Sequence, residues 1–113
     1  MKANIINVPN KYHQPIKKTV IDFIRSRKIN PDCTINIEFV SKEKIKSLNN
    51  KYRQTNKTTD VLSFPIWEKQ DKMPKRGIIC LGDIIICPRM TAIDKELDNL
   101  IKHSLDHLVG KHH

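Results

Sequence analysis

The feature that most constrains the fold is a nearly continuous apolar run over residues 77–87, interrupted only by Gly82 and Asp83. An extended segment of this kind is apolar on both faces, so it belongs in the interior of a sheet. Pro88 follows the run and ends it, because proline has no N–H to donate to a neighbouring strand. The sequence therefore predicts an interior strand in the last third of the chain.

Three further segments have the pattern of strands. Residues 3–8 form a short apolar run that ends at Pro9, and residues 33–40 alternate apolar and polar side chains, as a half-buried strand does. Residues 61–67 contain Pro65, so this strand should lie at an edge of the sheet or end there. With the interior run, the sequence predicts about four strands.

Helical spacing of apolar residues predicts three helices between and after these strands. Pro15 suits the first turn of one helix, and Ser41 is a plausible N-cap of the next. The buried face of this second helix is marked by Ile45, Leu48 and Tyr52. Residues 49–60 are polar and are expected to be an irregular surface loop. The final helix is expected over residues 91–108.

Length, charge and cysteine content narrow the class of protein. The 113 residues suffice for one domain with a modest core, and 21 Lys and Arg against 12 Asp and Glu give a net charge of +9. This charge favours polyanions such as nucleic acid or an anionic membrane surface, although a lysine-rich composition alone also produces it. Aromatic residues are sparse and do not alternate with basic ones, so no stacking platform for single strands is predicted.

Cys33, Cys80 and Cys87 fit neither a paired-cysteine zinc site nor a disulfide framework. Two of them lie in the apolar run, where buried reduced thiols are the norm. No apolar segment has the length of a membrane span, and the N-terminus lacks a signal peptide. The sequence therefore predicts a cytoplasmic protein with no membrane partner.

The end of the chain carries the strongest chemical signal. His103 and His107 are four residues apart, so on a helix they lie one turn apart on the same face and can bind one metal ion. Gly110 is expected to take a left-handed conformation and turn the chain back, which brings His113 towards the pair. This spacing is that of metzincin zinc proteases, but Ser104 stands where the helical HExxH motif has its glutamate. The pattern predicts zinc on the C-terminal helix and argues against an ordinary protease.

Other interpretations of this segment remain open. A histidine pair at this spacing is often surface decoration, and the terminal His-His could be a fragment of a purification tag. His112 is a spare imidazole that could exchange with His113 as a ligand or be solvated. Asp106, on the same helix, is either an outer partner of the histidines or an exposed side chain.

Three blocks of the sequence resemble the YbeY endoribonucleases, which are bacterial rRNA maturation factors. The blocks are LNNKYR with TDVLSFP (residues 48–53 and 59–65), LGDIIICP (81–88) and HSLDHLVGKHH (103–113). They occur in the family's order and cover roughly residues 35–113. The last block has Ser104 where the family has glycine, and Lys111 and His112 where it has tyrosine and aspartate. The chain thus looks like a short member of the family, shortened at its C-terminus.

The resemblance implies a single α+β domain over residues 1–113, with a mixed sheet flanked by helices. It implies one Zn²⁺ ion held by His103, His107 and His113, with Arg53 in the cleft that faces the metal. The activity it implies is that of a single-strand-specific endoribonuclease in 16S rRNA 3′-end maturation and ribosome quality control. Single-stranded RNA and ribosomal particles are the partners that follow from this activity.

Asp60 and Ser63 belong to the family's TDVLSFP block and are expected to be mainly architectural.

The chemistry of these residues is consistent with phosphodiester cleavage. Three histidines leave a fourth zinc position for water, whose pKa falls from about 15.7 towards about 7. The planar guanidinium of Arg53 can hold a phosphate through two hydrogen bonds, unless it is simply an exposed loop arginine. Two other functions stay open: a basic RNA- or ribosome-binding module with weakened or lost catalysis, and a metallohydrolase of another substrate such as a peptide. The nucleophile, the general base, the cleavage site and the oligomeric state are not given by the sequence.

Overall fold

Four strands and three α-helices make up the described part of this computed structural model, which comprises residues 2–67 and 69–110. In chain order they are β1 (Lys2–Ile6), α1 (His13–Ser26), β2 (Cys33–Phe39), α2 (Lys42–Arg53), β3 (Val61–Pro65), β4 (Ile79–Ile86) and α3 (Ile93–Leu108). Short 3-10 helices lie at Asn10–Tyr12, Gln70–Lys72 and Pro88–Met90. The α+β class and the number of strands predicted from the sequence are confirmed.

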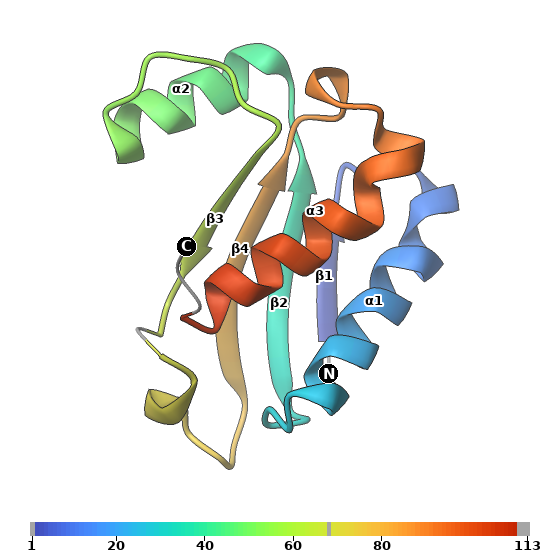
Figure 1. Cartoon of the computed structure of the whole chain (residues 1–113), viewed down its shortest axis with the longest axis vertical. Coiled ribbons are helices and arrows are strands. Elements are labelled where there is room, and N and C mark those ends of the chain that lie inside the picture. The colour runs from blue at the N-terminus through green and yellow to red at the C-terminus, as the bar shows by residue number, and fades with distance from the viewer. Residues whose placement is uncertain (1, 68, 111–113) are drawn as a thin grey trace.

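The strands form one mixed sheet in the order β1-β2-β4-β3. β1, β2 and β4 run parallel, and β3 is antiparallel to β4 at the edge (Figure 1). The apolar run is indeed an interior strand, since β4 lies between β2 and β3. Pro65 ends β3, as expected for a residue without an N–H on an edge strand.

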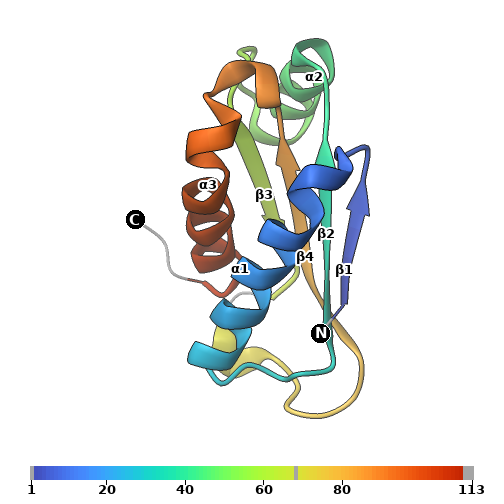
Figure 2. The same cartoon turned by 90° about the vertical axis from the view of Figure 1, so that its right-hand side faces the viewer.

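Helices α1 and α3 cover one face of the sheet (Figures 1 and 2). Alternation along β2 buries every second side chain, and the helices bury the stripes predicted from their apolar spacing. The buried residues of the two helices are Ile16, Val20, Ile24, Leu97, Ile101, Ser104, Leu105 and Leu108. Across the helix pair, Asp98 accepts a hydrogen bond from the Thr19 hydroxyl, and its ion pair with Lys102 together with this bond lowers the pKa of its carboxyl group.

Helix α2 covers the other face of the sheet only at one end, where Ile45 packs with Leu62 and Cys87. Its N-cap is Ser41, whose hydroxyl accepts a hydrogen bond from the Lys44 backbone N–H, as predicted. None of the described helices is long and apolar enough to cross a bilayer.

Two predictions about this helix were wrong. It continues to Arg53 instead of giving way to a loop at Asn49, and Tyr52 is 55% exposed instead of buried. Asn49 is buried in its place, and its amide donates to the Lys57 carbonyl, which holds the following loop against the helix. In Figure 1 the last turn of α2 lies at the outer edge of the sheet beside β3, and no further strand lies beyond it.

Gly82 allows the closest approach of β4 to its neighbours. Its φ is +140°, and a Cβ there would lie 2.3 Å from the Phe64 carbonyl oxygen and 3.0 Å from Cδ2 of Leu108. Only glycine tolerates both this backbone conformation and this contact. The end of α3 can therefore pack directly onto the sheet at this position.

The variant Gly82→Ala is expected to lower the free energy of unfolding by at least about 3 kcal/mol, through backbone strain and steric overlap together. Gly77→Ala is the matched control: φ is +84° there, but no atom lies within 4 Å of the added Cβ. In the control, the free energy of unfolding should fall only by the contribution of backbone strain, about 1 kcal/mol. Urea unfolding measures both, and equal losses in the two variants would show that the contact with β3 and α3 contributes nothing.

Candidate active site

The candidate site is centred on Ser63, in the edge strand β3. Its Oγ lies 2.6 Å from Nδ1 of His107 on α3. Its carbonyl oxygen accepts a hydrogen bond of 2.6 Å from Nη2 of Arg53 at the end of α2. One residue of the sheet therefore contacts both a predicted metal ligand and the predicted phosphate-binding arginine.

The geometry of β3 explains both contacts. Successive side chains of a strand point to opposite faces, so Ser63 faces α3 while Leu62 and Phe64 face the other side. The Phe64 carbonyl faces β4, where it would meet a side chain at Gly82, so the carbonyl of Ser63 points away from β4. An edge strand leaves such outward carbonyls unpaired, and Arg53 donates to this one.

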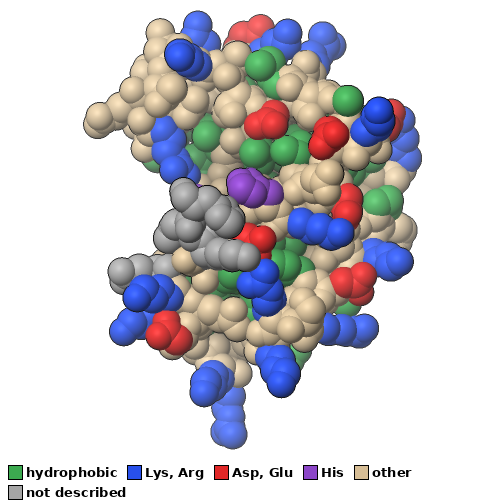
Figure 3. All heavy atoms as spheres, viewed as in Figure 1, with side chains coloured by type: hydrophobic (Ala, Val, Ile, Leu, Met, Phe, Trp, Pro, Cys, Tyr) green, Lys and Arg blue, Asp and Glu red, His purple; other side chains and the backbone are tan. Residues whose placement is uncertain are grey.

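The histidines of α3 lie on the flank of its buried stripe. His103 is exposed and His107 is half-buried, one turn apart on the same side of the helix. Figure 3 shows histidine atoms at the surface of the face that α3 covers. Gly110 follows the helix with φ +90°, which confirms the predicted left-handed turn.

Within the described residues, the positions of these two imidazoles are compatible with a metal site. A ligating histidine commonly gives its second ring nitrogen to a hydrogen-bond partner, and Ser63 contacts Nδ1 of His107, so Nε2 is the ring nitrogen that would bind a metal. Within residues 2–67 and 69–110, no group of three His, Cys, Asp or Glu side chains could hold an ion. The predicted third ligand, His113, and the spare His112 lie outside the described residues.

Arg53 is exposed, and its guanidinium carbon lies 5.5 Å from the centroid of the Phe64 ring. In the described part of the chain it forms no ion pair with a carboxylate. Among the described residues, the hydrogen bond to Ser63 uses one of its five N–H donors. An arginine in this state can bind an anion.

Two other residues of α3 have structural roles. The carboxylate of Asp106 pairs with Nη2 of Arg27 at 2.5 Å, which joins α1 to α3. Ser104 is 1% exposed, and its hydroxyl has no hydrogen-bond partner among the described residues. Because it faces the core, it cannot serve as the general base that a glutamate supplies at this position in the HExxH motif.

In the TDVLSFP block, the Asp60 backbone carbonyl accepts a hydrogen bond from the Cys87 N–H, and the architectural role expected for this block stays a prediction. That expectation did not include the side-chain contact of Ser63 with His107. Strand alternation could have placed Ser63 on the same face as Val61. No local pattern, however, could have given the helical residue opposite it, because the two partners are 44 residues apart in sequence.

Comparison with known proteins agrees with this fold. The family model described as Endoribonuclease YbeY matches residues 1–113. A protein of Alkaliphilus metalliredigens named Endoribonuclease YbeY is 31% identical over 117 residues, covering 96% of this chain and 76% of that protein. Its namesake in Staphylococcus carnosus is 31% identical over 120 residues, covering 94% of this chain and 76% of that protein.

A third relative with the same name, from Thermodesulfovibrio yellowstonii, is 38% identical over 88 residues, covering 70% of this chain and 53% of that protein. Among solved structures, the solution structure of TM1509 from Thermotoga maritima matches with a TM-score of 0.57 and 21% identity. That match covers 98% of this chain and 73% of the other, and it supports the fold. Since the family model spans every residue, the chain belongs to the YbeY endoribonuclease family.

Proposed function

We propose that the chain, as one domain, is a metal-dependent endoribonuclease of the cytoplasm that cleaves single-stranded RNA. The observation that carries this proposal is the double contact of Ser63, with His107 on one side and Arg53 on the other. It brings a metal-binding imidazole and a phosphate-binding guanidinium to the same residue. Membership of the endoribonuclease family supports RNA as the substrate.

His103, His107 and His113 are proposed to hold one Zn²⁺ ion. When bound, zinc supplies a Lewis acid that polarises a phosphoryl oxygen. With zinc on Nε2, the Nδ1–H of His107 would donate to the Ser63 hydroxyl oxygen, and this hydrogen bond would fix the orientation of the ring. Ser63 is thus a positioning residue, and the histidines are ligands.

Arg53 is proposed to bind the scissile phosphate. Its hydrogen bond to the Ser63 carbonyl and its contact with the Phe64 ring hold the guanidinium beside β3. The remaining N–H donors can bind two phosphate oxygens and stabilise the charge that develops in the transition state. The net charge of +9 attracts RNA to the protein from a distance, an effect that salt screens.

The RNA is proposed to be rRNA in ribosomal particles, with cleavage at the 3′ end of 16S rRNA in maturation and quality control. This finer assignment rests on the resemblance to rRNA maturation factors. The free thiols of Cys33, Cys80 and Cys87 are consistent with a reducing compartment.

The test is cleavage of end-labelled RNA by the purified protein after its zinc content has been measured. We expect cleavage of a single strand and not of the matching duplex, loss of activity with a chelator, and recovery on adding zinc. Zinc-loaded protein that binds RNA without cutting it would overturn the proposal in favour of an RNA-binding module. Hydrolysis of peptides but not RNA would favour a different metallohydrolase.

Ser63→Ala is expected to weaken zinc binding by about 10- to 100-fold, the usual effect of removing a hydrogen-bond partner of a metal ligand. The cause is the loss of the acceptor for His107, since Arg53 bonds to the main chain of this residue and keeps its partner. Ser63→Thr retains a hydroxyl and is the control. Competition with a chromophoric chelator measures the affinity, and an unchanged value in Ser63→Ala would refute the positioning role.

A further inference from the structure

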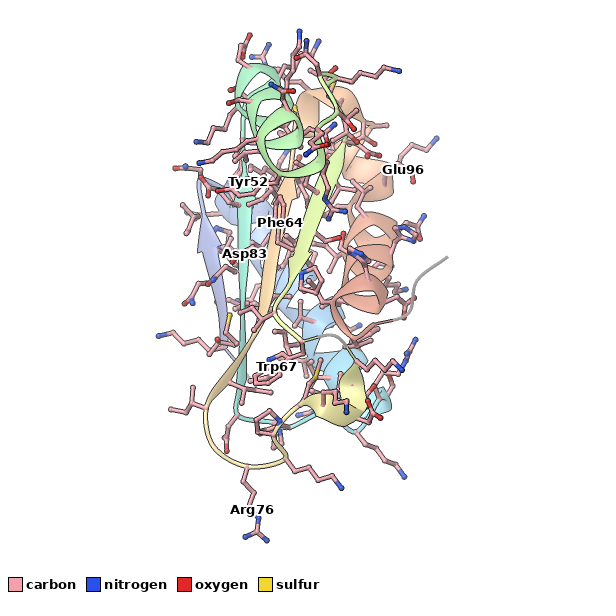
Figure 4. The ribbon with its side chains drawn as sticks, turned by 90° about the vertical axis from the view of Figure 1, so that its left-hand side faces the viewer. Tyr52, Phe64, Trp67, Arg76, Asp83 and Glu96 are labelled. Carbon is pink, nitrogen blue, oxygen red and sulfur yellow. The ribbon has the colours of Figure 1, made fainter. Side chains whose placement is uncertain are left out.

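Tyr52 is an aromatic side chain at the surface, on the last turn of α2. It is 55% exposed, and its ring meets that of Phe64 nearly edge to face, with centroids 5.4 Å apart and planes at 68°. Phe64 is half-buried beneath α2, so it fixes the position of Tyr52 without covering it. Figure 4 shows the two residues beside each other where α2 meets β3.

A cation flanks each of these rings. Lys51 Nζ lies 5.1 Å from the centroid of Tyr52, and the guanidinium of Arg53 lies 5.5 Å from that of Phe64. Neither cation forms an ion pair with a carboxylate in the part of the chain that the structure describes. Sites for single-stranded nucleic acid combine these elements, because bases stack on aromatic rings while cations bind the phosphates on either side.

The sequence alone predicts no stacking platform for single strands, because aromatic and basic residues do not alternate along it. Composition shows few aromatic residues, but the fold brings two of them together from α2 and β3, between two basic side chains. Tyr52 was expected in the core, and its exposure instead makes the ring available to a ligand.

The rings of Tyr52 and Phe64, here called the platform, are continuous with the candidate active site around the outer edge of β3. Ser63 and Phe64 are neighbours in the strand, so Ser63 faces α3 and Phe64 faces the opposite side of the sheet. Arg53 lies between them, since it bonds to the Ser63 carbonyl and contacts the Phe64 ring. An RNA strand with a phosphate at Arg53 therefore has the Tyr52 ring within reach of an adjacent base.

We propose that Tyr52, supported by Phe64, is a stacking site for one unpaired RNA base next to the phosphate that Arg53 binds. The inference rests on the proposed function and adds a determinant of substrate choice to it. A base in a duplex is already stacked and paired, so occupying this site requires a nucleotide that is free to turn outward. The platform would thus favour single strands because only an unpaired base can stack on it, while the basic side chains bind the phosphate.

The test compares variants of Tyr52 for binding to a short labelled single-stranded RNA in the presence of a chelator, so that no cleavage occurs. Tyr52→Ala and Tyr52→Leu are expected to weaken binding by about 5- to 100-fold, the range for loss of one base–aromatic stack. Tyr52→Phe keeps the ring and should bind like the unmodified protein. Ile78→Ala is the matched control, because Ile78 is 85% exposed and lies outside the platform.

A second measurement identifies the base. In a set of oligonucleotides that each carry one abasic position, the unmodified protein should lose affinity most strongly at one position. In Tyr52→Ala, the abasic nucleotide at that position should cause no additional loss of affinity, because this variant has no ring on which the base could stack. Circular dichroism and thermal melting verify that each variant is folded.

The outcomes separate the two proposals. If the unmodified protein binds and cuts single-stranded RNA while Tyr52→Ala binds equally well, the stacking site is refuted and the proposed function stands. If Tyr52→Leu binds as well as Tyr52→Phe, apolar area rather than stacking is responsible, and the proposal fails. If the unmodified protein neither binds nor cuts RNA, the proposed function fails and the stacking site fails with it.

Discussion

His107→Ala is expected to abolish metal binding and RNA cleavage together. The substitution removes one of the two proposed ligands that lie on one face of α3, and it leaves Ser63 without its imidazole partner. When residues act together as a catalytic unit, removing one of them commonly lowers the rate as much as removing the whole unit. The cleavage rate should therefore fall by at least about a thousandfold. Zinc content by mass spectrometry and cleavage of labelled RNA give the two readouts.

The control for this variant is His13→Ala. His13 lies at the start of α1, and its ring contacts the Val8 carbonyl at 2.8 Å, away from the candidate site. It removes the same side chain from a helix without touching a proposed ligand, so zinc content and cleavage should remain. Full zinc occupancy in His107→Ala would contradict the proposed metal site.

Arg53→Ala is expected to keep the metal and lose about 100- to 1,000-fold in kcat, the range for a donor that stabilises charge in the transition state. Arg53 bonds to the carbonyl of Ser63 and not to its side chain, so the contact between Ser63 Oγ and His107 stays in place. Arg53→Lys should recover only part of the rate, because an ammonium group lacks the planar pair of donors. Steady-state cleavage with measured zinc content separates kcat from KM.

A loss of positive charge alone would also weaken RNA binding, so a charge-matched control is needed. Arg76→Ala removes the same charge from the loop before β4, which Figure 4 shows at the opposite end of the molecule from Tyr52. It should raise KM slightly and leave kcat unchanged. Equal effects of the two substitutions would mean that Arg53 acts only through the overall field.

The predictions that succeeded rest on local chemistry. The apolar run predicted the interior strand, and Pro65 predicted the end of the edge strand. Ser41 was correctly predicted as a helix N-cap, and Gly110 as the left-handed turn. Each follows from a backbone preference or a periodicity within a few neighbouring residues. Such signals are present before the chain folds.

The predictions that failed depend on where elements meet. Apolar spacing put Tyr52 on the buried face of α2, but the end of α2 lies at the outer edge of the sheet, and nothing in the sequence of the helix records the position of β3. The pair of His103 and His107 was visible as a spacing on one helix. The contacts that complete the candidate site, Ser63 with His107 and Phe64 with Tyr52, form only in three dimensions.

The location of the site on an edge strand has a consequence for solubility. The free side of β3 is a template on which a strand of another molecule could add, and sheets grow into aggregates in this way. Two positions on that side are closed to such pairing, because Pro65 has no N–H and the Ser63 carbonyl already accepts from Arg53. The arginine proposed to bind RNA therefore also shields the sheet from unwanted self-association.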